Sequence, residues 1–522
     1  MSLARTIARN VFSNAAGFFV NIAVGILLSP FVADQLGTAG FGFWNLLISC
    51  TGSYGLLDIG IRSAVGQYVT RYWAKGDVDG VSRTLSTAAV LMGFGGLAVL
   101  LLGGVVTVVG PWIFHLDGVD DGTARTLFAI VAGGVAINFP LMIAQAATYA
   151  RSRFDIATGI AIFERLSFAA LAVWVLVEDH GLIGLAIANA ASQTAANLAR
   201  VIAAKRLLPG ATVARRFFER SSVRELYGYS VFSVMINAGD QVLIHAASLI
   251  IPMLVGASSL ALYGVGANLV GYMLALVSTI AWTLTPHATA SDARGDLQSV
   301  RALWIRGSRP ILAFAAVIGG GIVFVGSDFI AAWMGPDYAA GIARAKDGVT
   351  QIGTFTPSPW IASILVFGAL ARAAMTVGWQ ICFGLREVRP LARLSFAEAG
   401  LLIVLGFVLC AAFGEIGVAI ASVTATAIVQ LWYLPRFLSR RLDVPLSSFY
   451  ASIPTAPVAV FATLFVIHLA LDARLPHDTW NAVLVKAPIY GIPGLVAAFA
   501  FGTTRDEKQA ILARLRLRGR SA

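Results

Sequence analysis

The chain has 522 residues, of which 58% are hydrophobic and only 12% carry a charge, against about 25% charged residues in a typical soluble domain. This composition excludes a soluble globular protein and indicates a polytopic membrane protein. The net charge of +11 does not call for a nucleic-acid partner, because the basic residues concentrate in predicted cytoplasmic loops that face anionic lipid headgroups.

Apolar stretches long enough to cross a bilayer as a helix recur along the whole chain. They predict about fourteen transmembrane helices and an all-α fold. The fifth is the least secure of them, because Glu164 and Arg165 interrupt it. The stretches are 11–33, 41–61, 87–114, 127–149, 156–177, 182–204, 230–255, 260–286, 311–334, 360–383, 394–413, 416–437, 449–471 and 482–501.

The distribution of Lys and Arg predicts the topology. With the N-terminus inside, 32 of the 38 basic residues fall on the inner side, whereas Arg372 lies in the middle of the tenth stretch. Both termini are therefore expected in the cytoplasm. The C-terminal sequence RDEKQAILARLRLRGR is expected to form a basic amphipathic helix on the membrane surface.

Three short motifs occur twice, in the same order. AKGD at 74–77 returns as ARGD at 293–296, RLSFA at 165–169 returns at 393–397, and GLIGLAIA at 181–188 returns as GEIGVAIA at 414–421. Collinear matches whose spacing grows slowly along the chain indicate a duplicated unit. Each unit holds six stretches, and an even number returns the chain to the same side. The repeat therefore predicts two parallel six-helix bundles around a central cavity.

The repeat also predicts the domain boundaries. The expected segments are an N-terminal six-helix bundle at 1–204, a cytoplasmic connecting loop at 205–229, a C-terminal six-helix bundle at 230–437, and two extra transmembrane helices with a basic tail at 438–522. Two bundles with a cavity between them are the geometry by which transporters alternate access.

Enzyme chemistry receives little support from the sequence. The six histidines are scattered and no zinc-protease, serine-hydrolase or nucleotide-binding motif is present. Cys50, Cys382 and Cys410 all lie in predicted helices, so neither a disulfide nor a metal site is expected. We expect a transporter without a cofactor.

Several motifs, taken in order, resemble a known family. They are PFVADQLGTAGFGFW at 30–44, YGLLDIG at 54–60, AKGD at 74–77, FGLREVRPLARLSF at 383–396 and GEIGVAIA at 414–421. With the layout of six, six and two helices, they resemble the polysaccharide flippases of the multidrug/oligosaccharidyl-lipid/polysaccharide exporter superfamily, and the resemblance covers essentially the whole chain.

The resemblance implies a flippase of the bacterial inner membrane. Its expected substrate is an undecaprenyl-pyrophosphate-linked oligosaccharide, moved from the cytoplasmic to the periplasmic leaflet, and its candidate partners are a polysaccharide polymerase and export machinery. The alternatives are a cation-coupled multidrug exporter of the same superfamily and, from another class, a membrane glycan polymerase or ligase. The last would need a sizeable outside loop with catalytic side chains.

Polar residues within predicted helices are candidates for the substrate cavity, because they are costly in a bilayer. The first stretch places Asn14 and Asn21 on one helix face, and the seventh places Asn237, Asp240 and Gln241 on a comparable face. Asn21 and Asp240 are separated by the same number of residues as AKGD and ARGD, so the repeat makes these two residues equivalent. Lining of the cavity is the favoured interpretation, and simple helix-to-helix hydrogen bonding is the alternative.

Arg372 is the most informative candidate. Gln380 lies two helical turns later on the same helix face, and an arginine fork suits a pyrophosphate group. The alternative is a structural salt bridge from Arg372 to Glu398.

For two further groups of residues, a structural role is the favoured interpretation. Asp58 and Arg62 are candidates for a gate or a cation site, although an ion pair within the helix is favoured for them. The repeated arginines, Arg165 and Arg393, are expected to anchor their helices at the headgroups rather than to contact substrate.

Overall fold

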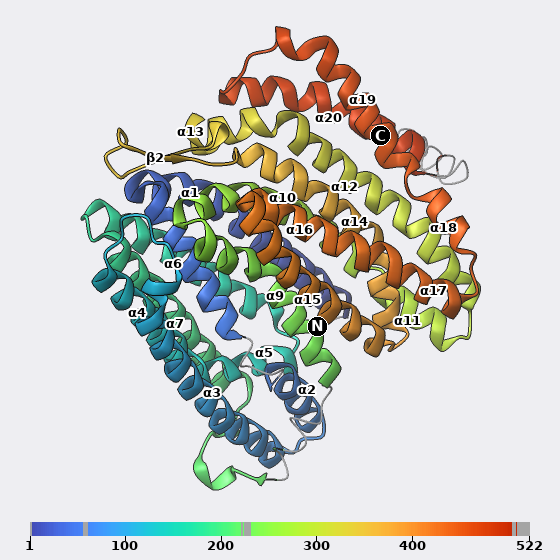
Figure 1. Ribbon diagram of the computed structural model, residues 1–522. Helices are drawn as coiled ribbons and strands as arrows, with labels where there is room; N and C mark the ends of the chain where they lie inside the picture. Colours follow the sequence, from blue (N-terminus) through green and yellow to red (C-terminus); the bar gives the residue numbers. More distant parts are fainter. Residues whose placement is uncertain (1–2, 56–60, 221–222, 224–230, 504–507, 509–522) are drawn as a thin grey trace, which may run out of the picture. The chain divides into compact units, whose positions relative to one another are not determined.

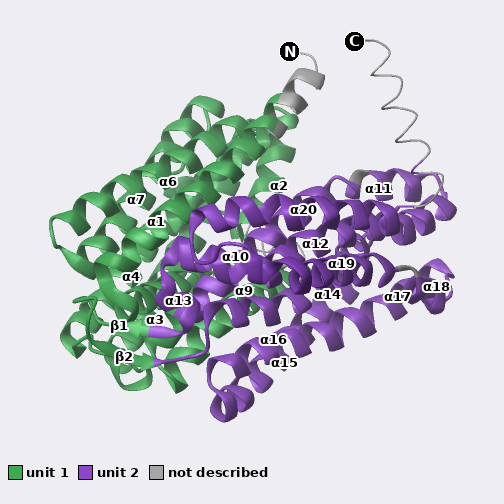
Figure 2. Cartoon of the chain, turned by 90° about the horizontal axis from the view of Figure 1, so that it is seen from above, with its two compact units in different colours: residues 1–261, 343–353 green, residues 262–342, 354–522 purple. Residues whose placement is uncertain are grey.

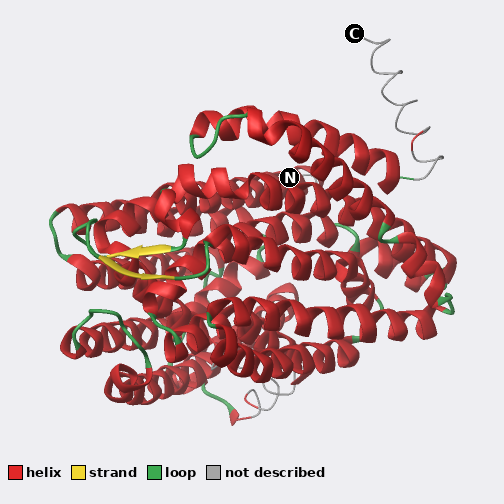
Figure 3. Ribbon diagram, turned by 45° about the horizontal axis from the view of Figure 1, so that its top comes forward, coloured by secondary structure: helices red, strands yellow, loops and turns green. Residues whose placement is uncertain are grey.

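The computed structural model of the protein describes residues 3–55, 61–220, 223, 231–503 and 508. The described chain is almost entirely helical, apart from one two-stranded sheet of β1 (Ile342–Arg344) and β2 (Gln351–Thr354) (Figure 3). Twelve helices among the described residues are long and apolar enough to cross a membrane. The predicted all-α polytopic membrane fold is therefore confirmed.

The twelve helices and the fourteen predicted stretches describe the same pattern. Helix α1 (Leu3–Tyr54) covers the first two stretches and is broken at Gly37, whose φ of 70° and ψ of 173° are not helical. Helix α7 (Gly181–Leu207) covers the sixth stretch but is too polar to count among the twelve, because amides and hydroxyls interrupt it. Dividing α1 at Gly37 and adding α7 gives the fourteen.

The chain forms two compact units, each described here by itself (Figure 2). Unit 1 comprises residues 1–261 and 343–353, and unit 2 comprises residues 262–342 and 354–522. The repeat assigns the seventh stretch to the second bundle, whereas the contacts of α9 (Val231–Leu254) place it in unit 1. Contacts and sequence duplication are different criteria, so the repeat-based boundaries stay a prediction.

The helices of unit 1 follow one another along the blue-to-green part of the chain (Figure 1). They are α1, α2 (Ile61–Ala74), α3 (Val78–Ile113), α4 (Asp121–Asn138), α5 (Ala146–Ala150), α6 (Phe154–Val177), α7 and α9, with 3-10 turns η2 (Pro140–Gln145) and η3 (Arg215–Phe217). Helix α1 packs against α6 and α9, and α4 packs against α3 and α7.

Small residues explain how closely α3 and α4 approach. Gly96, Gly103 and Gly110 recur at a regular heptad spacing on α3 and all face α4 or the turn that follows it. A Cβ at Gly103 would come within 2.2 Å of the Cβ of Ala132. Such packing of small residues is typical of helix pairs in membranes, where no hydrophobic effect drives helices together.

The helices of unit 2 extend from the end of α10 (Ala257–Trp282), which crosses the boundary between the units, to the C-terminus. They are α11 (Thr285–Ala293), α12 (Leu297–Met334), α13 (Pro336–Ala340), α14 (Ser358–Gly384), α15 (Val388–Phe413), α16 (Glu415–Ile428), the π-helical turn η4 (Val429–Tyr433), α17 (Leu434–Leu442), α18 (Leu446–Ser452), α19 (Thr455–Leu471), the 3-10 turn η5 (Asp472–Arg474) and α20 (Trp480–Gly502).

Helix α12 is the centre of unit 2. It packs against α14 on one side and against both α19 and α20 on another (Figure 1). The contact with α19 and α20 is apolar along most of its length and includes the buried residues Ala316, Val460, Leu464 and Tyr490. The two helices that the sequence places outside the repeat are thus an integral part of this unit.

The repeated AKGD and ARGD motifs have the same local structure. Gly76 and Gly295 adopt φ values of 73° and 70°, which lie in the left-handed region that favours glycine. The aspartates that follow cap the next helices: the Asp77 carboxylate accepts from the Gly80 amide at 2.7 Å, and Asp296 accepts from the Ser299 amide at 3.0 Å. The motif is therefore repeated because it starts α3 and α12 in the same way.

Candidate functional site

Unit 1 contains a cavity of about 910 Å³, called cavity 1 here. Its walls come from α2, the end of α1, the turn η2, α5 and α9. The polar residues that line it are Arg62, Gln67, Thr70, Arg71, Gln145, Tyr149, Asn237, Asp240 and Gln241. A volume of this size suits a small-molecule ligand or the headgroup of a larger one.

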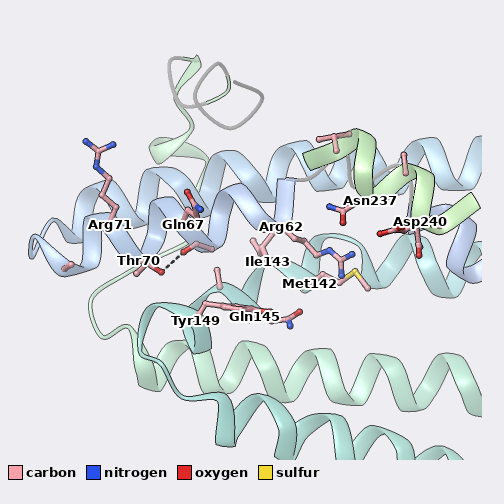
Figure 4. A pocket seen from close by; sticks show the side chains of 17 residues that line it. Arg62, Gln67, Thr70, Arg71, Met142, Ile143, Gln145, Tyr149, Asn237 and Asp240 are labelled. Carbon is pink, nitrogen blue, oxygen red and sulfur yellow. Dashed lines mark hydrogen bonds between the residues drawn. The ribbon is translucent and has the colours of Figure 1, made fainter. Parts of the chain in front are cut away.

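Figure 4 shows how the charged groups lie around cavity 1. Arg62 extends from α2 toward the side of the cavity where Asn237 and Asp240 lie on α9, whereas Arg71 points away from the other labelled side chains. Arg62 and Asn237 are exposed and Asp240 is half-buried. Arg62 is therefore the cation best placed to meet a ligand in cavity 1.

The end of α1 is joined to α9 beside this cavity. The side-chain amide of Gln241 donates to the Gly52 carbonyl at 3.0 Å. The His245 ring packs on the same turn so closely that a Cβ at Gly52 would lie 2.2 Å from its Nε2 atom. Because Gly52 has no side chain, the two helices can approach here, which positions Asp240 and Gln241 on the cavity wall.

A second cavity of about 690 Å³, called cavity 2, also lies within unit 1, between α1, α6, α7 and α9. Its polar lining residues are Asn14, Asn21, Thr51, Tyr149, Thr158, Glu164, Arg165, Asn189, Ser192, Gln193 and His245. Tyr149 lines both cavities, so they adjoin at this side chain.

Two hydrogen bonds join α1 to α6 across cavity 2. The Thr158 hydroxyl donates to Asn14 Oδ1 at 3.1 Å, and Arg165 Nε donates to Asn21 Oδ1 at 2.7 Å. Asn14, Asn21 and Arg165 nevertheless remain exposed. Both interpretations of the α1 asparagines thus have support here, because they bond to a neighbouring helix and also line a cavity.

Arg165 is a cavity residue that the sequence interpretation missed. Its place in the repeated RLSFA motif suggests a headgroup anchor, but the structure places its side chain on cavity 2 beside Asn21. The available signal was the interruption of the fifth apolar stretch, since a charge within a membrane helix is costly unless it meets a partner or water.

Behind cavity 2, a hydrogen-bonded network fixes α4, α6 and α7. Arg200 bonds to Glu164 at 2.7 Å and to Asn197 at 2.6 Å, and Asn197 in turn donates to Asn138 at 2.8 Å. Asn138 also donates to the Thr194 hydroxyl at 3.0 Å. Glu164 is thereby neutralised by Arg200, so the anion on the wall of cavity 2 is already paired.

Arg372 and Gln380 lie in unit 2 and do not belong to the lining of cavity 1 or cavity 2. Arg372 bonds to the fully buried Glu398 at 2.8 Å, which is the salt bridge raised as the alternative. Glu398 also accepts from Thr426 at 2.8 Å and from Gln430 at 2.7 Å. The Gln380 amide oxygen accepts from the Thr285 hydroxyl at 2.5 Å. A substrate role for Arg372 and Gln380 stays a prediction.

The remaining predicted residues divide between the two cavities and the undescribed chain. Arg62, Asn237, Asp240 and Gln241 line cavity 1. The repeat-equivalent pair Asn21 and Asp240 therefore faces two different cavities. Asp58 and the basic C-terminal tail, apart from Lys508, lie outside the described residues.

A further charged cluster, which the sequence analysis does not identify, ties α20 and the turn η5 that follows α19 to α12. Lys486 Nζ donates to Asp328 at 2.7 Å, to Asp472 at 2.8 Å and to His477 Nδ1 at 3.0 Å. The Lys486 side chain is 1% exposed. The two carboxylates and the imidazole lie close enough together to hold a metal ion, but the ammonium group bonds to all three and so occupies that position.

The fold and cavities define a class of protein: a polytopic helical membrane protein with polar, charge-bearing cavities among its spanning helices. Residues 36–342 match the sequence model of the family described as "Polysaccharide biosynthesis protein". This match covers more than half of the chain, and the protein belongs to that family.

The chain is also similar to a curated protein and to solved structures. The uncharacterized membrane protein EpsK of Bacillus subtilis (strain 168) is 20% identical over 523 residues, and the alignment covers 97% of each chain. The lipid II flippase MurJ in an inward closed conformation has a TM-score of 0.69 at 14% identity, covering 94% of this chain and 98% of MurJ.

An inward-facing multidrug resistance transporter of the MATE family, in the MOP superfamily, has a TM-score of 0.60 at 12% identity and covers 82% of this chain and 95% of its own. At these identities the two solved structures establish the fold. The predicted resemblance to a family of polysaccharide synthesis is confirmed by the family match, and the similarity to this exporter superfamily is one of fold.

Proposed function

We propose that the protein is a flippase for a lipid-linked oligosaccharide. It would carry an undecaprenyl-pyrophosphate-linked glycan from the cytoplasmic to the periplasmic leaflet of the bacterial inner membrane, by alternating access and in service of surface polysaccharide synthesis. Family membership supports the link to polysaccharide synthesis. The similarity in fold to a protein described as a lipid II flippase supports transport of a lipid-linked sugar.

The observation that carries the proposal is cavity 1, with Arg62 beside amide side chains. A guanidinium group matches the geometry of phosphate oxygens, and Gln67, Gln145 and Asn237 supply further donors. In a membrane protein such a lining is expensive unless it serves a polar ligand or water. We assign the pyrophosphate to Arg62 and its remaining oxygens to the amide group of Asn237 on α9.

The proposed direction follows from topology. The basic-residue distribution predicts that the connection from α2 to α3, which contains Lys75, is cytoplasmic. Ala74, at the end of α2, lines cavity 1 next to this connection. A cavity at that end would load its substrate from the cytoplasmic leaflet, where the charged headgroup starts.

One observation favours a second candidate. Asp240 on the wall of cavity 1 would suit a cationic drug, and a multidrug transporter shares the fold. Arg62 and Arg71 line the same cavity, so its charged lining residues are two cations against one anion, which favours an anionic ligand over a cationic one. The flippase is therefore preferred, and the drug exporter becomes an outcome of the experiment.

The experiment uses the host that carries the gene. Deletion is expected to cause an undecaprenyl-pyrophosphate glycan to accumulate on the cytoplasmic side, measured by mass spectrometry of extracted lipids and by protection from an external glycan-cleaving enzyme. Wild-type protein should relieve the accumulation, and Arg62→Met protein at equal level should not. Arg71→Met is the matched control, because Arg71 lines the same cavity but points away from the labelled side chains.

Two results would overturn the proposal. If the glycan reaches the outer leaflet unchanged in the deletion strain and no second flippase is present, the protein is not the flippase for it. If deletion instead sensitises the cells to cationic drugs, with Asp240→Asn giving the same sensitivity, the exporter is the better description.

A further inference from the structure

Cavity 2 has a polar lining that the proposed pyrophosphate site does not use. Asn189 and Gln193 lie one turn apart on α7, both line the cavity and both are half-buried. Within the described part of the chain, neither side chain makes a hydrogen bond. An amide left without partners in a membrane protein loses hydrogen-bonding energy, so these two need water or a ligand.

The neighbouring polar groups on cavity 2 differ from these two amides. Arg165 is bonded to Asn21, Asn14 accepts from Thr158, and the Ser192 hydroxyl donates to the Ala188 carbonyl at 2.8 Å. Tyr149 and His245 also line this cavity, but α7 carries the two lining amides that have no hydrogen bond within the described chain. Asn189 and Gln193 each offer both donors and an acceptor, as do the hydroxyl and acetamido groups of a sugar.

Cavity 2 offers a second phosphate fewer cations than cavity 1 does. Among its described lining residues, the one arginine, Arg165, stays cationic but already donates to Asn21, and the one carboxylate, Glu164, is paired with Arg200. A polyprenyl tail is disfavoured as well, because it would leave the amides of α7 without hydrogen bonds. A neutral polar ligand fits this lining best.

Tyr149 connects this lining to cavity 1. Its side chain is 49% exposed, it lines both cavities, and its ring meets the Phe154 ring edge-to-face with centroids 5.4 Å apart. A sugar bonded to a pyrophosphate in cavity 1 lies next to it, and cavity 2 adjoins cavity 1 at Tyr149.

We propose that cavity 2 is the subsite for the sugar residues next to the pyrophosphate, with Asn189 and Gln193 as specificity-determining hydrogen-bonding residues and Tyr149 as the aromatic surface between the two subsites. This inference rests on the proposed flippase function and assigns the part of the substrate that each cavity binds. Neutral sugars with hydroxyl and acetamido groups are the ligand class.

The test compares two lipids on the full chain in lipid nanodiscs: undecaprenyl pyrophosphate, and the same lipid carrying one N-acetylglucosamine. Wild-type protein should bind the glycosylated lipid about tenfold more tightly, since two new hydrogen bonds contribute about this factor. Asn189→Ala with Gln193→Ala should abolish that increment and leave the affinity for undecaprenyl pyrophosphate unchanged. Arg62→Met should weaken the binding of both lipids equally. Thermal unfolding verifies that each variant is folded.

The outcomes separate this inference from the proposed function. If wild type binds both lipids equally, or if the double variant keeps the increment, cavity 2 is not the sugar subsite, while the loss in Arg62→Met still supports the flippase. If wild type binds neither lipid, the proposed function and the subsite both fail. Should the double variant not fold, Gln193→Met, which keeps the length of the side chain, is expected to lose a part of the increment.

Discussion

The polar interiors of the two units differ in one respect. In unit 2, the charged groups bond to partners close by. Lys486 bonds to Asp328, Asp472 and His477, which together are called the Lys486 cluster here, and Arg372 bonds to Glu398. These distances are 2.7 to 3.0 Å. In unit 1, Arg200 and Glu164 pair in the same way, but cavity 2 also leaves the amides of Asn189 and Gln193 unbonded within the described chain. Charge within a membrane helix is therefore a poor guide to a binding site on its own. Open hydrogen-bonding capacity on a cavity wall is a better one.

The Lys486 cluster should give the largest effect on stability. Lys486→Met would leave Asp328 and Asp472 facing one another without a cation, at a site where the lysine is 1% exposed. Removal of one partner of a buried ion pair costs about 3 to 5 kcal/mol, because a buried charge remains uncompensated. We expect a clear fall in the thermal unfolding temperature in nanodiscs.

A combined variant distinguishes lost charge balance from lost packing. Lys486→Met together with Asp328→Asn and Asp472→Asn removes the uncompensated carboxylates and should recover most of the stability. No recovery would mean that the lysine stem, rather than the ion cluster, holds α20 against α12. Substrate binding to cavity 1 should be unchanged in every folded variant of this cluster.

The Arg372–Glu398 pair should give an intermediate effect. Arg372 is 33% exposed, so the solvent reduces the cost of removing it, and Arg372→Met should lower stability by about 1 to 3 kcal/mol. Thr426 and Gln430 would still bond to Glu398. Arg372→Met with Glu398→Gln should restore both stability and transport if the pair is structural.

The same double variant tests the predicted substrate role of Arg372. If Arg372 meets the pyrophosphate, its loss lowers transport whether or not Glu398 is neutralised. Stability restored without transport would therefore support the substrate role and weaken the contrast between the two units. Glycan accumulation in the host and thermal unfolding of the purified protein measure the two quantities separately.

Much of the fold was predictable, because it depends on local and periodic features. Hydropathy located every described long helix, and the AKGD repeat marked two helix starts with the same glycine turn and aspartate cap. The unit to which α9 belongs was not predictable in this way. It depends on contacts such as Gln241 with Gly52, which join segments distant in sequence.

The candidate site was predictable in its residue types and less so in its grouping. Helical periodicity identified Asn14, Asn21, Asn237 and Asp240, all of which line cavities. It could not show that they face two cavities, and it left the Arg372–Glu398 salt bridge as one of two alternatives. Whether a polar side chain is bonded or open depends on the helix opposite, which a single helix pattern does not contain.

The smallest effect is expected at an exposed ion pair of unit 1, which serves as the reference for the buried ones. Lys346 donates to Asp179 at 2.6 Å, and this hydrogen bond, with the attraction of the ammonium group, lowers the pKa of the Asp179 carboxyl below its ordinary value. A lowered pKa in the folded state stabilises the protein above the ordinary pKa, near 3.9, and the contribution is lost as the pH falls through the folded-state pKa. Asp179→Asn should therefore differ slightly from wild type in thermal unfolding at neutral pH. The difference should begin to fade as the pH falls below about 4, vanish once the pH is below the lowered folded-state pKa, and shrink in high salt. An effect at neutral pH as large as that of Lys486→Met would contradict the view that burial, rather than ion pairing itself, sets the cost of breaking these contacts.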